Sequence, residues 1–319
     1  MKKAILILIT IIAVFYGTTG CRQNRTAMAH NKNGKITVIT TVFPSYDFVR
    51  QIAGDRVNLA MLLPPGAESH SFEPSPKNII AIQNSDIFIY NGGESEKWVS
   101  RILQSMNTEN MKIFAMLDAV DIVEEEIVEG MENDENENND NHKTAYDEHV
   151  WTSPKNAILI VKAITDLLCD TDAPNSAYYR ERNSLYIEAL TQLDNAFDVL
   201  VNNAKRKTII FADRFPFRYF ADAYGLFYMA AFPGCSTETE PSAATVAFLI
   251  NKIRAERIPV VFHIELSNQR MADTISGETG AKKLLLHSCH NITKKDFDSG
   301  LGYLDLMNRN VESLREALF

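Results

Sequence analysis

Apolar residues along most of this chain fall into short β-branched runs that alternate with longer segments of helical spacing. The strand-like run KITVITTV begins at Lys35, and the segment PSYDFVRQIAG that follows has Pro44 in its first turn and a glycine at its end. The alternation resumes at the strand-like run TIIFAD, which begins at Thr208, and continues to the C-terminus. Strands that alternate with helices predict parallel sheets with helices on both faces, so we expect an α/β fold.

One long segment in the middle of the chain keeps helical spacing without any strand-like run. Its apolar positions are Tyr179, Leu185, Ile187, Leu190, Leu193, Phe197 and Leu200. A helix of this extent is roughly 40 Å long at about 1.5 Å per residue, which is typical of a rod between two domains. We therefore predict an N-terminal α/β lobe over residues 35–174, a backbone helix over 175–206 and a C-terminal α/β lobe over 207–319, each lobe with its own parallel sheet.

The N-terminus has the pattern of a secretory signal. Residues 1–20 contain a pair of lysines, an apolar run over 4–17 and small residues before Cys21. The apolar run is shorter than the about 20 residues that a membrane-spanning helix needs. The pattern resembles a bacterial lipoprotein signal, in which the cysteine is lipidated, although Thr18 stands where an aliphatic residue is usual. We predict a signal peptide over 1–20, a lipid anchor at Cys21 and a polar tether over 21–34, with simple secretion or a retained anchor as alternatives.

The composition is that of an ordinary globular protein with an acidic balance. The chain has 319 residues, of which 45% are hydrophobic and 23% are charged. Its formal net charge of -9 at pH 7 argues against nucleic-acid binding, which needs a basic surface. Residues 124–144 are acidic and rich in asparagine, and we predict a solvated surface loop there. A cation-collecting arm of carboxylates around His142 is the alternative.

The cysteines beyond the signal have different surroundings. Cys169 lies on the apolar side of a predicted helix, where a cysteine behaves as a small buried hydrophobe. Cys235 and Cys289 each follow a predicted strand, so a disulfide between them is possible, and an extracytoplasmic location permits one. A thiolate ligand at Cys289 is the alternative to that bridge.

Two histidines share one sequence context. His70 stands in HSFEPSPKNI and His149 in HVWTSPKNAI, and each precedes a Ser-Pro-Lys-Asn segment that begins a predicted helix. Loops of this kind gather beyond the carboxyl ends of strands in α/β sheets, where ligands bind. Neutral imidazole is a common ligand of zinc and similar metals, and the chain contains no G-x-S-x-G, P-loop or H-E-x-x-H motif. The two histidines therefore favour a metal site.

These segments, together with DEHVWTSP after the acidic loop, the long central helix and ETGAKKLLLHS, resemble the zinc/manganese solute-binding proteins of ABC transporters, the cluster with a rigid backbone helix. The resemblance runs from about Lys35 to the C-terminus, and the motifs H-x-x-E-P-x-P and D-x-H-x-W-x-S-P are specific in combination. It implies two α/β lobes, a single transition-metal ion in the cleft between them, and delivery of that ion to a membrane permease.

The resemblance also implies a set of ligands. His70 and His149 match the first two family ligands, both in the N-terminal lobe. The third position usually holds His or Glu, but this chain has Arg214 there, and a guanidinium has no lone pair to donate. Asp213 or a water is a possible replacement, and Arg214 paired with an acid such as Glu265 is an alternative arrangement.

The fourth family ligand is an acid after the penultimate strand, where this chain has LLLHSCHN, with His287 at that point and His290 three residues on. We interpret His287 as the replacement for the donor lost at Arg214, and a surface histidine at a strand end is the other interpretation. His263, within VVFHIE, is predicted to be a hydrogen-bonded core histidine. Three histidines and one oxygen favour zinc over manganese, which prefers carboxylate oxygens.

Neighbouring side chains are candidates to support these ligands. Glu73 and Asp147 are placed to accept the second ring N–H of an imidazole ligand, and a turn acid and a helix N-terminal acid are the alternatives. Glu265 is a third candidate for this supporting role. Trp151 is expected to pack under His149.

The function that the resemblance implies is that of a lipid-anchored metal-binding subunit of an ABC importer, on the outer face of the cytoplasmic membrane. Zinc is the expected solute and manganese the alternative. The expected partners are the permease, the ATPase through it, and the membrane through Cys21; we expect a monomer, no catalysis and no nucleic acid. A surface adhesin on the same scaffold and a zinc hydrolase are the competing functions, and the hydrolase is disfavoured because no helix carries an i, i+4 ligand pair.

Overall fold

The computed structural model of this protein describes residues 34–69, 71–131, 146–236 and 241–319. The chain divides into two compact units, Met1–Gly34 and Lys35–Phe319, and both sheets of the fold belong to the second unit. Among the helices of the described ranges, none is long and apolar enough to cross a membrane.

Several sequence-based predictions lie outside the described residues. They include the signal peptide over 1–20, the lipidation of Cys21 and the cation-collecting role of His142. His70, the first predicted metal ligand, also lies outside the described residues.

The first sheet consists of four parallel strands in the order β2-β1-β3-β4. Its elements are β1 (Thr37–Thr40), α2 (Phe43–Ala53), β2 (Asn58–Met61), α3 (Pro76–Gln83), β3 (Ile87–Tyr90), α4 (Lys97–Gln104), β4 (Lys112–Ala115) and η1 (Met116–Ala119). Val38 and Ile87 belong to the main core, whereas Ile39 and Phe88 pack on the opposite face with Trp98 of α4. Apolar side chains therefore pack on both faces of this sheet, as is usual for a parallel sheet.

The second sheet also has four parallel strands, in the order β6-β5-β7-β8. Its elements are β5 (Thr208–Phe215), α7 (Arg218–Tyr224), β6 (Phe227–Pro233), α8 (Ala243–Glu256), β7 (Val260–His263), α9 (Arg270–Thr279), β8 (Lys282–Leu285), α10 (Lys294–Asp298) and α11 (Tyr303–Leu318). Phe211 and Phe262 face the main core, with ring centroids 5.3 Å apart. Ile210 and Val261 face the other way and pack against Leu249 of α8.

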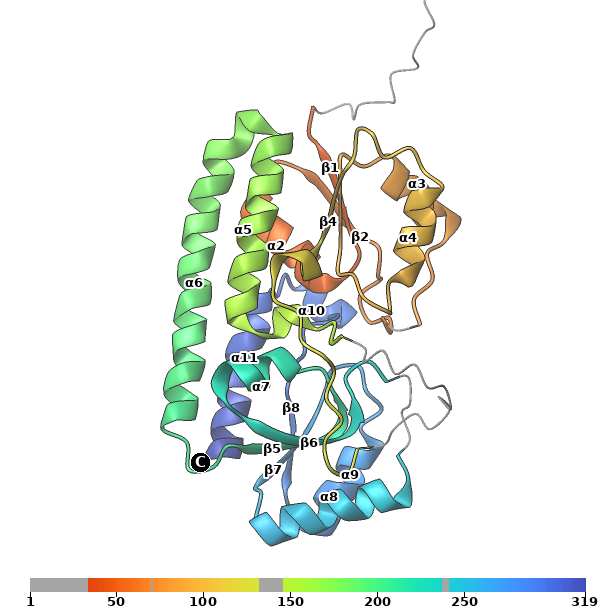
Figure 1. Ribbon diagram of the computed structural model, residues 1–319. Helices are drawn as coiled ribbons and strands as arrows, with labels where there is room; N and C mark the ends of the chain where they lie inside the picture. Colours follow the sequence, from red (N-terminus) through yellow and green to blue (C-terminus); the bar gives the residue numbers. More distant parts are fainter. Residues whose placement is uncertain (1–33, 70, 132–145, 237–240) are drawn as a thin grey trace, which may run out of the picture. The chain divides into compact units, whose positions relative to one another are not determined.

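A long helix joins the two sheets. The connecting elements are η2 (Val150–Thr152), α5 (Pro154–Thr171), η3 (Ala173–Asn175) and α6 (Ser176–Asn202). Figure 1 shows α6 beside α5 and running past both sheets. Tyr186 of α6 contacts Phe48 of α2, with ring centroids 6.3 Å apart, and Phe197, further along, contacts Phe220 of α7 at 4.8 Å. The predicted architecture of two parallel-sheet lobes joined by one long helix is confirmed.

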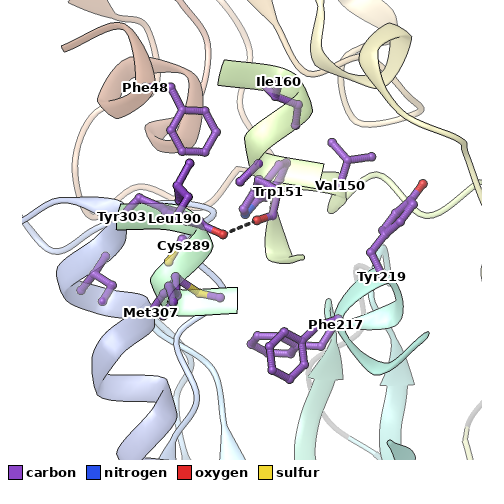
Figure 2. Packing of buried hydrophobic residues seen from close by; sticks show 14 of the residues in the cluster. Phe48, Val150, Trp151, Ile160, Leu190, Phe217, Tyr219, Cys289, Tyr303 and Met307 are labelled. Atoms are coloured by element: carbon purple, nitrogen blue, oxygen red, sulfur yellow. Dashed lines mark hydrogen bonds between the residues drawn. The ribbon is translucent and has the colours of Figure 1, made fainter. Parts of the chain in front are cut away.

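The main core lies where α5, α6 and α11 meet, and Figure 2 shows its packing. The Tyr303 hydroxyl is fully buried there and donates a hydrogen bond of 2.7 Å to the Trp151 carbonyl oxygen. Leu190 of α6 is also fully buried, but Leu185 is 58% exposed, so its assignment to the apolar face of the helix is wrong. The core holds the turn that follows His149, because Trp151 is part of that turn.

The predicted disulfide between Cys235 and Cys289 is wrong, since both residues are free thiols. Cys235 follows β6 and Cys289 follows β8, and these strands are the two opposite edges of the second sheet. Cys289 is fully buried in the main core, and Cys169 is buried there as well.

Candidate metal centre

A small cavity lies among the loops that follow the strands of both sheets. It is lined by Ala67, Glu68 and Ser69 after β2, by His149, and by residues at or just beyond the ends of β5, β6, β7 and β8. Its volume is about 30 Å³. A single water needs roughly 10–15 Å³ by the same measure, so the cavity has room for an ion or about two waters and none for an organic solute.

His149 is fixed at this cavity by Asp147, two residues before it in the sequence. Asp147 Oδ1 accepts a hydrogen bond from the His149 backbone N–H at 2.7 Å and lies 3.1 Å from ring Nδ1. Because Nδ1 is held by the carboxylate, Nε2 is the nitrogen through which His149 can bind a metal. Burial lowers the pKa of His149, but the Asp147 carboxylate raises it, and the pKa lies above the ordinary histidine value.

Trp151 connects His149 to the C-terminal lobe. The two rings meet edge to face with centroids 5.6 Å apart, and Trp151 Nε1 donates to the Ser288 carbonyl oxygen at 2.8 Å. The Trp151 ring also lies 4.9 Å from the ring of His290. The Trp151 indole therefore packs against both imidazoles, that of His149 and that of His290.

His290 lies beside His149. Their ring centroids are 5.3 Å apart with an interplanar angle of 84°, and both residues line the cavity. His290 Nδ1 lies 3.2 Å from Ser69 Oγ, and its backbone N–H donates to Glu265 Oε1 at 3.1 Å. Sequence reasoning named His290 only as a neighbour of His287, so the residue that completes this pair was missed.

His287 is not among the residues that line the cavity, although its Nδ1 lies 3.6 Å from Oε2 of Glu265, which does line it. Its Nδ1 accepts a hydrogen bond of 3.0 Å from the Cys289 backbone N–H, and its own backbone N–H donates to Asn310 Oδ1 on α11 at 2.8 Å. Cys289, between the two histidines, has a φ of 62°, in the left-handed region, which changes the course of the backbone there. Beyond this residue His290 lines the cavity, whereas His287 is not among the lining residues.

Arg214 lines the cavity, and Asp213 does not. The pairing of β5 with β6 is irregular between Phe211 and Arg214, and such bulges change the direction in which a side chain points. The Arg214 guanidinium bonds both carboxylate oxygens of Glu68, at 3.2 and 3.5 Å, and the Ser236 carbonyl oxygen at 3.4 Å. Its acidic partner is thus Glu68 and not the suggested Glu265. Sequence position was the available signal for Glu68, which stands two residues before His70.

Asp213, the predicted oxygen ligand, and Glu265, a predicted supporting acid, both accept hydrogen bonds from the protein itself. Asp213 accepts the backbone N–H of Arg214 at 2.9 Å and of Ile264 at 3.3 Å, and burial raises its pKa. Glu265 accepts the backbone N–H and the hydroxyl of Ser288 at 2.7 and 2.6 Å, as well as the N–H of His290. Glu265 therefore holds the loop that carries His290.

Two further predicted residues lie apart from the cavity. Glu73 is exposed and is not among the residues that line it. His263 is buried, and its Nδ1 lies 2.9 Å from the Ile264 carbonyl oxygen. Within the described ranges no three His, Cys, Asp or Glu side chains are arranged to hold a metal ion together. The described part of the cavity thus contributes two imidazoles, His149 and His290, and the residues directly before position 70.

Direct contacts between loops of the two lobes close the cavity. Asn291 Nδ2 donates to the carbonyl oxygens of Pro64 and Ala67, at 2.9 and 2.8 Å. With the Arg214–Glu68 ion pair, these bonds tie the loop after β2 to the ends of the C-terminal strands. Two parallel-sheet lobes, one backbone helix and a histidine-lined cavity of ionic size define a solute-binding protein of the metal-transport class.

The comparisons with known proteins specify the family. Residues 38–317 match the family described as ZnuA, zinc-uptake complex component A, periplasmic, and the chain belongs to this family. The resemblance to ABC-transporter solute-binding proteins is therefore confirmed. Members of this family are components of transport systems, which places the chain among solute-binding proteins of ABC zinc uptake.

Individual relatives match over nearly the whole chain. The high-affinity zinc uptake system protein ZnuA of Bacillus subtilis (strain 168) is 36% identical over 312 residues, which are 98% of this chain and 97% of that protein. The zinc-binding lipoprotein AdcA of Streptococcus pneumoniae (strain ATCC BAA-255 / R6) is 33% identical over 318 residues, and this chain spans 61% of its length. The crystal structure of the Zn(II)-bound ZnuA-like domain of Streptococcus pneumoniae AdcA has a TM-score of 0.74 and 30% identity, and covers 89% of this chain and 99% of that domain.

Proposed function

We propose that this chain is the extracytoplasmic, lipid-anchored subunit of an ABC importer that captures zinc and delivers it to the membrane permease. The observation that carries the proposal is the pair of imidazoles from His149 and His290, which are far apart in the sequence and have ring centroids 5.3 Å apart. They line a cavity of about 30 Å³, which suits an ion. Membership of the zinc-uptake family supports zinc as the cargo.

The proposed ligands are His70, His149 and His290, with a water or a carboxylate oxygen as the fourth donor. His70 is included on its sequence motif alone, because it lies outside the described residues. His290 takes the place that the sequence suggested for His287, because the ring of His290 lines the cavity. Three nitrogen donors at a near-tetrahedral site favour zinc, whereas manganese prefers oxygen donors.

The proposed location and partners follow from the sequence and the family. The signal pattern before Cys21 supports lipid anchoring at the outer face of the cytoplasmic membrane. A permease, and an ATPase through it, would receive the metal, and we expect the subunit to act as a monomer. The long helix α6 contacts both lobes, so release would come from small movements of the loops around the cavity and not from a wide hinge opening.

Equilibrium titration of the purified protein with zinc and with manganese, in competition with a chelator, tests this function. We compare the wild type with His290→Asn and His287→Asn. Each substitution keeps an acceptor close to the position of Nδ1 and removes Nε2. We expect His290→Asn to weaken zinc binding by about 100-fold or more, since it removes a ligand, and His287→Asn to leave it within about threefold.

Two outcomes of this titration contradict the proposal. A wild-type protein that binds neither metal would refute metal capture altogether. A loss of affinity in His287→Asn with none in His290→Asn would refute the ligand set. Growth of a deletion strain that fails only under chelation and recovers with added zinc separates an importer from an adhesin on the same scaffold.

A further inference from the structure

A permanent positive charge lies at the wall of the proposed cation site. The guanidinium of Arg214 lines the cavity, and its side chain is 10% exposed. It bonds both carboxylate oxygens of Glu68, at 3.2 and 3.5 Å, in a forked arrangement that joins the loop after β2 to the end of β5. A guanidinium remains charged at every physiological pH and offers no lone pair to a metal.

The ion pair between Arg214 and Glu68 has two effects on a cation in this cavity. The charge of Arg214 repels a divalent ion directly, and the repulsion is stronger where the surroundings are not water. Among the described residues, two carboxylates line the cavity, and the same ion pair occupies the oxygens of one of them, Glu68. The other, Glu265, is held by Ser288 and by the N–H of His290. The acids that the described residues contribute to the cavity, Glu68 and Glu265, are therefore both engaged by donors of the protein itself.

Contacts with the surrounding backbone fix the position of Arg214 at the cavity. The irregular pairing of β5 with β6 ends at Arg214, where Asp213 Oδ1 accepts the Arg214 N–H at 2.9 Å. A third contact, from the guanidinium to the Ser236 carbonyl oxygen at 3.4 Å, holds the far end of the side chain. Asn291 holds the loop of Glu68 through the Pro64 and Ala67 carbonyl oxygens, so the backbone on which Glu68 stands is anchored, although its side chain is 44% exposed.

We propose that Arg214 determines the metal affinity and selectivity of this site by withholding the Glu68 carboxylate from the bound ion. The site then offers imidazole nitrogens and withholds the carboxylate oxygens of Glu68. This arrangement favours zinc over manganese and limits the affinity for either metal, which makes release to a partner easier. The inference rests on the proposed function, because it concerns the same cavity and the same cargo.

The test is a double-mutant cycle read by chelator-competition titration with zinc and with manganese. In Arg214→Gln, Glu68 is released to the ion, and we expect zinc affinity to rise about tenfold and manganese affinity to rise more. In Glu68→Gln, the guanidinium loses its compensating charge, and we expect both affinities to fall. The double variant is expected to lie near the wild type. Zinc X-ray absorption of Arg214→Gln should show one additional oxygen ligand.

Controls separate this inference from the function on which it rests. Arg214→Lys keeps the positive charge but cannot bond both carboxylate oxygens of Glu68 as a guanidinium does. We expect it to raise metal affinity less than Arg214→Gln does. Thermal melting identifies a variant that does not fold, and Glu68→Gln then carries the test, because the Glu68 side chain is 44% exposed. Unchanged or weaker zinc binding in folded Arg214→Gln, or stronger binding in Glu68→Gln, overturns the role of Arg214. If the wild-type protein itself does not bind zinc, the proposed function is refuted, and not only the role of Arg214.

Discussion

The Asp147 carboxylate accepts hydrogen bonds from both the backbone and the ring of His149, with Oδ1 2.7 Å from the backbone nitrogen and 3.1 Å from Nδ1. Both residues are 1% exposed. A buried acceptor of this kind fixes the tautomer of an imidazole and makes the opposite nitrogen a better donor to a metal. The position of Asp147 thus prepares His149 for coordination before any ion arrives.

Asp147→Asn should therefore weaken zinc binding by about tenfold or more, because the neutral amide supports the imidazole less strongly. Glu73→Gln is the control, since Glu73 is exposed and does not line the cavity, and we expect its affinity to match the wild type. Chelator-competition titration of both variants gives the comparison. Equal affinities in Asp147→Asn and the wild type would remove Asp147 from the site.

Glu96 is a second buried acid of the N-terminal lobe. Its Oε2 accepts the backbone N–H groups of Asn91 and Gly92, at 2.7 and 2.9 Å. Burial raises the pKa of Glu96 from 4.5 to about 7, and the hydrogen bonds only partly oppose this effect. The folded protein therefore holds the proton of Glu96 more tightly than the unfolded chain does between these two pH values.

It follows that Glu96 makes the folded state most stable below about pH 4.5 and progressively less stable as the pH rises toward 7. The difference in unfolding free energy between Glu96→Gln and the wild type should increase by about 3 kcal/mol over this window and stay constant above it. Denaturant unfolding of both proteins across the pH range measures this difference. A difference independent of pH would show that Glu96 has an ordinary pKa.

At the scale of elements, the helix α6 stabilises the fold through one face only. Leu190 is fully buried in the main core, whereas Leu185, on the same helix, is 58% exposed. Leu190→Ala should lower the unfolding free energy by about 2–5 kcal/mol, because it leaves a cavity among packed side chains. Leu185→Ala is the matched control and should change it by less than about 0.5 kcal/mol. Similar losses in both variants would contradict the orientation of the helix.

The pattern of elements was predictable from the sequence because it depends on local spacing. Strand-like runs separated by helices identified two parallel sheets, and the uninterrupted helical spacing around Leu190 identified the connecting rod. Contacts between distant segments were not predictable in the same way. The prediction of a disulfide between Cys235 and Cys289 was wrong. Local spacing does not reveal the order of the strands, and β6 and β8 lie at opposite edges of the second sheet.

The site was predictable only where a motif identified it. His149 and Asp147 share one short motif, and the structure places both at the cavity or directly behind it. His290 depends on the left-handed turn at Cys289, which a non-glycine residue gives no reason to expect. The place of Glu68 two residues before His70 was a signal that it lies near the site, but its ion pair with Arg214 joins distant segments and could not be derived from local sequence.

At the scale of the whole molecule, the cavity exists because the loops of both lobes meet. Trp151 bonds the Ser288 carbonyl oxygen, Asn291 bonds the loop after β2, and α6 contacts helices of both lobes. A metal ion bound by His149 and His290 would add one more connection between the lobes. Binding is therefore expected to stabilise the folded protein, by an amount that grows with the concentration of free metal relative to its dissociation constant.

A crystal structure of the zinc-loaded protein, with the ion located by its anomalous scattering, tests the central claim most directly. The account predicts a single zinc ion in the cavity at about 2.0–2.1 Å from Nε2 of both His149 and His290. An ion bound by His287 in place of His290, or one outside the cavity that these two imidazoles line, would contradict it.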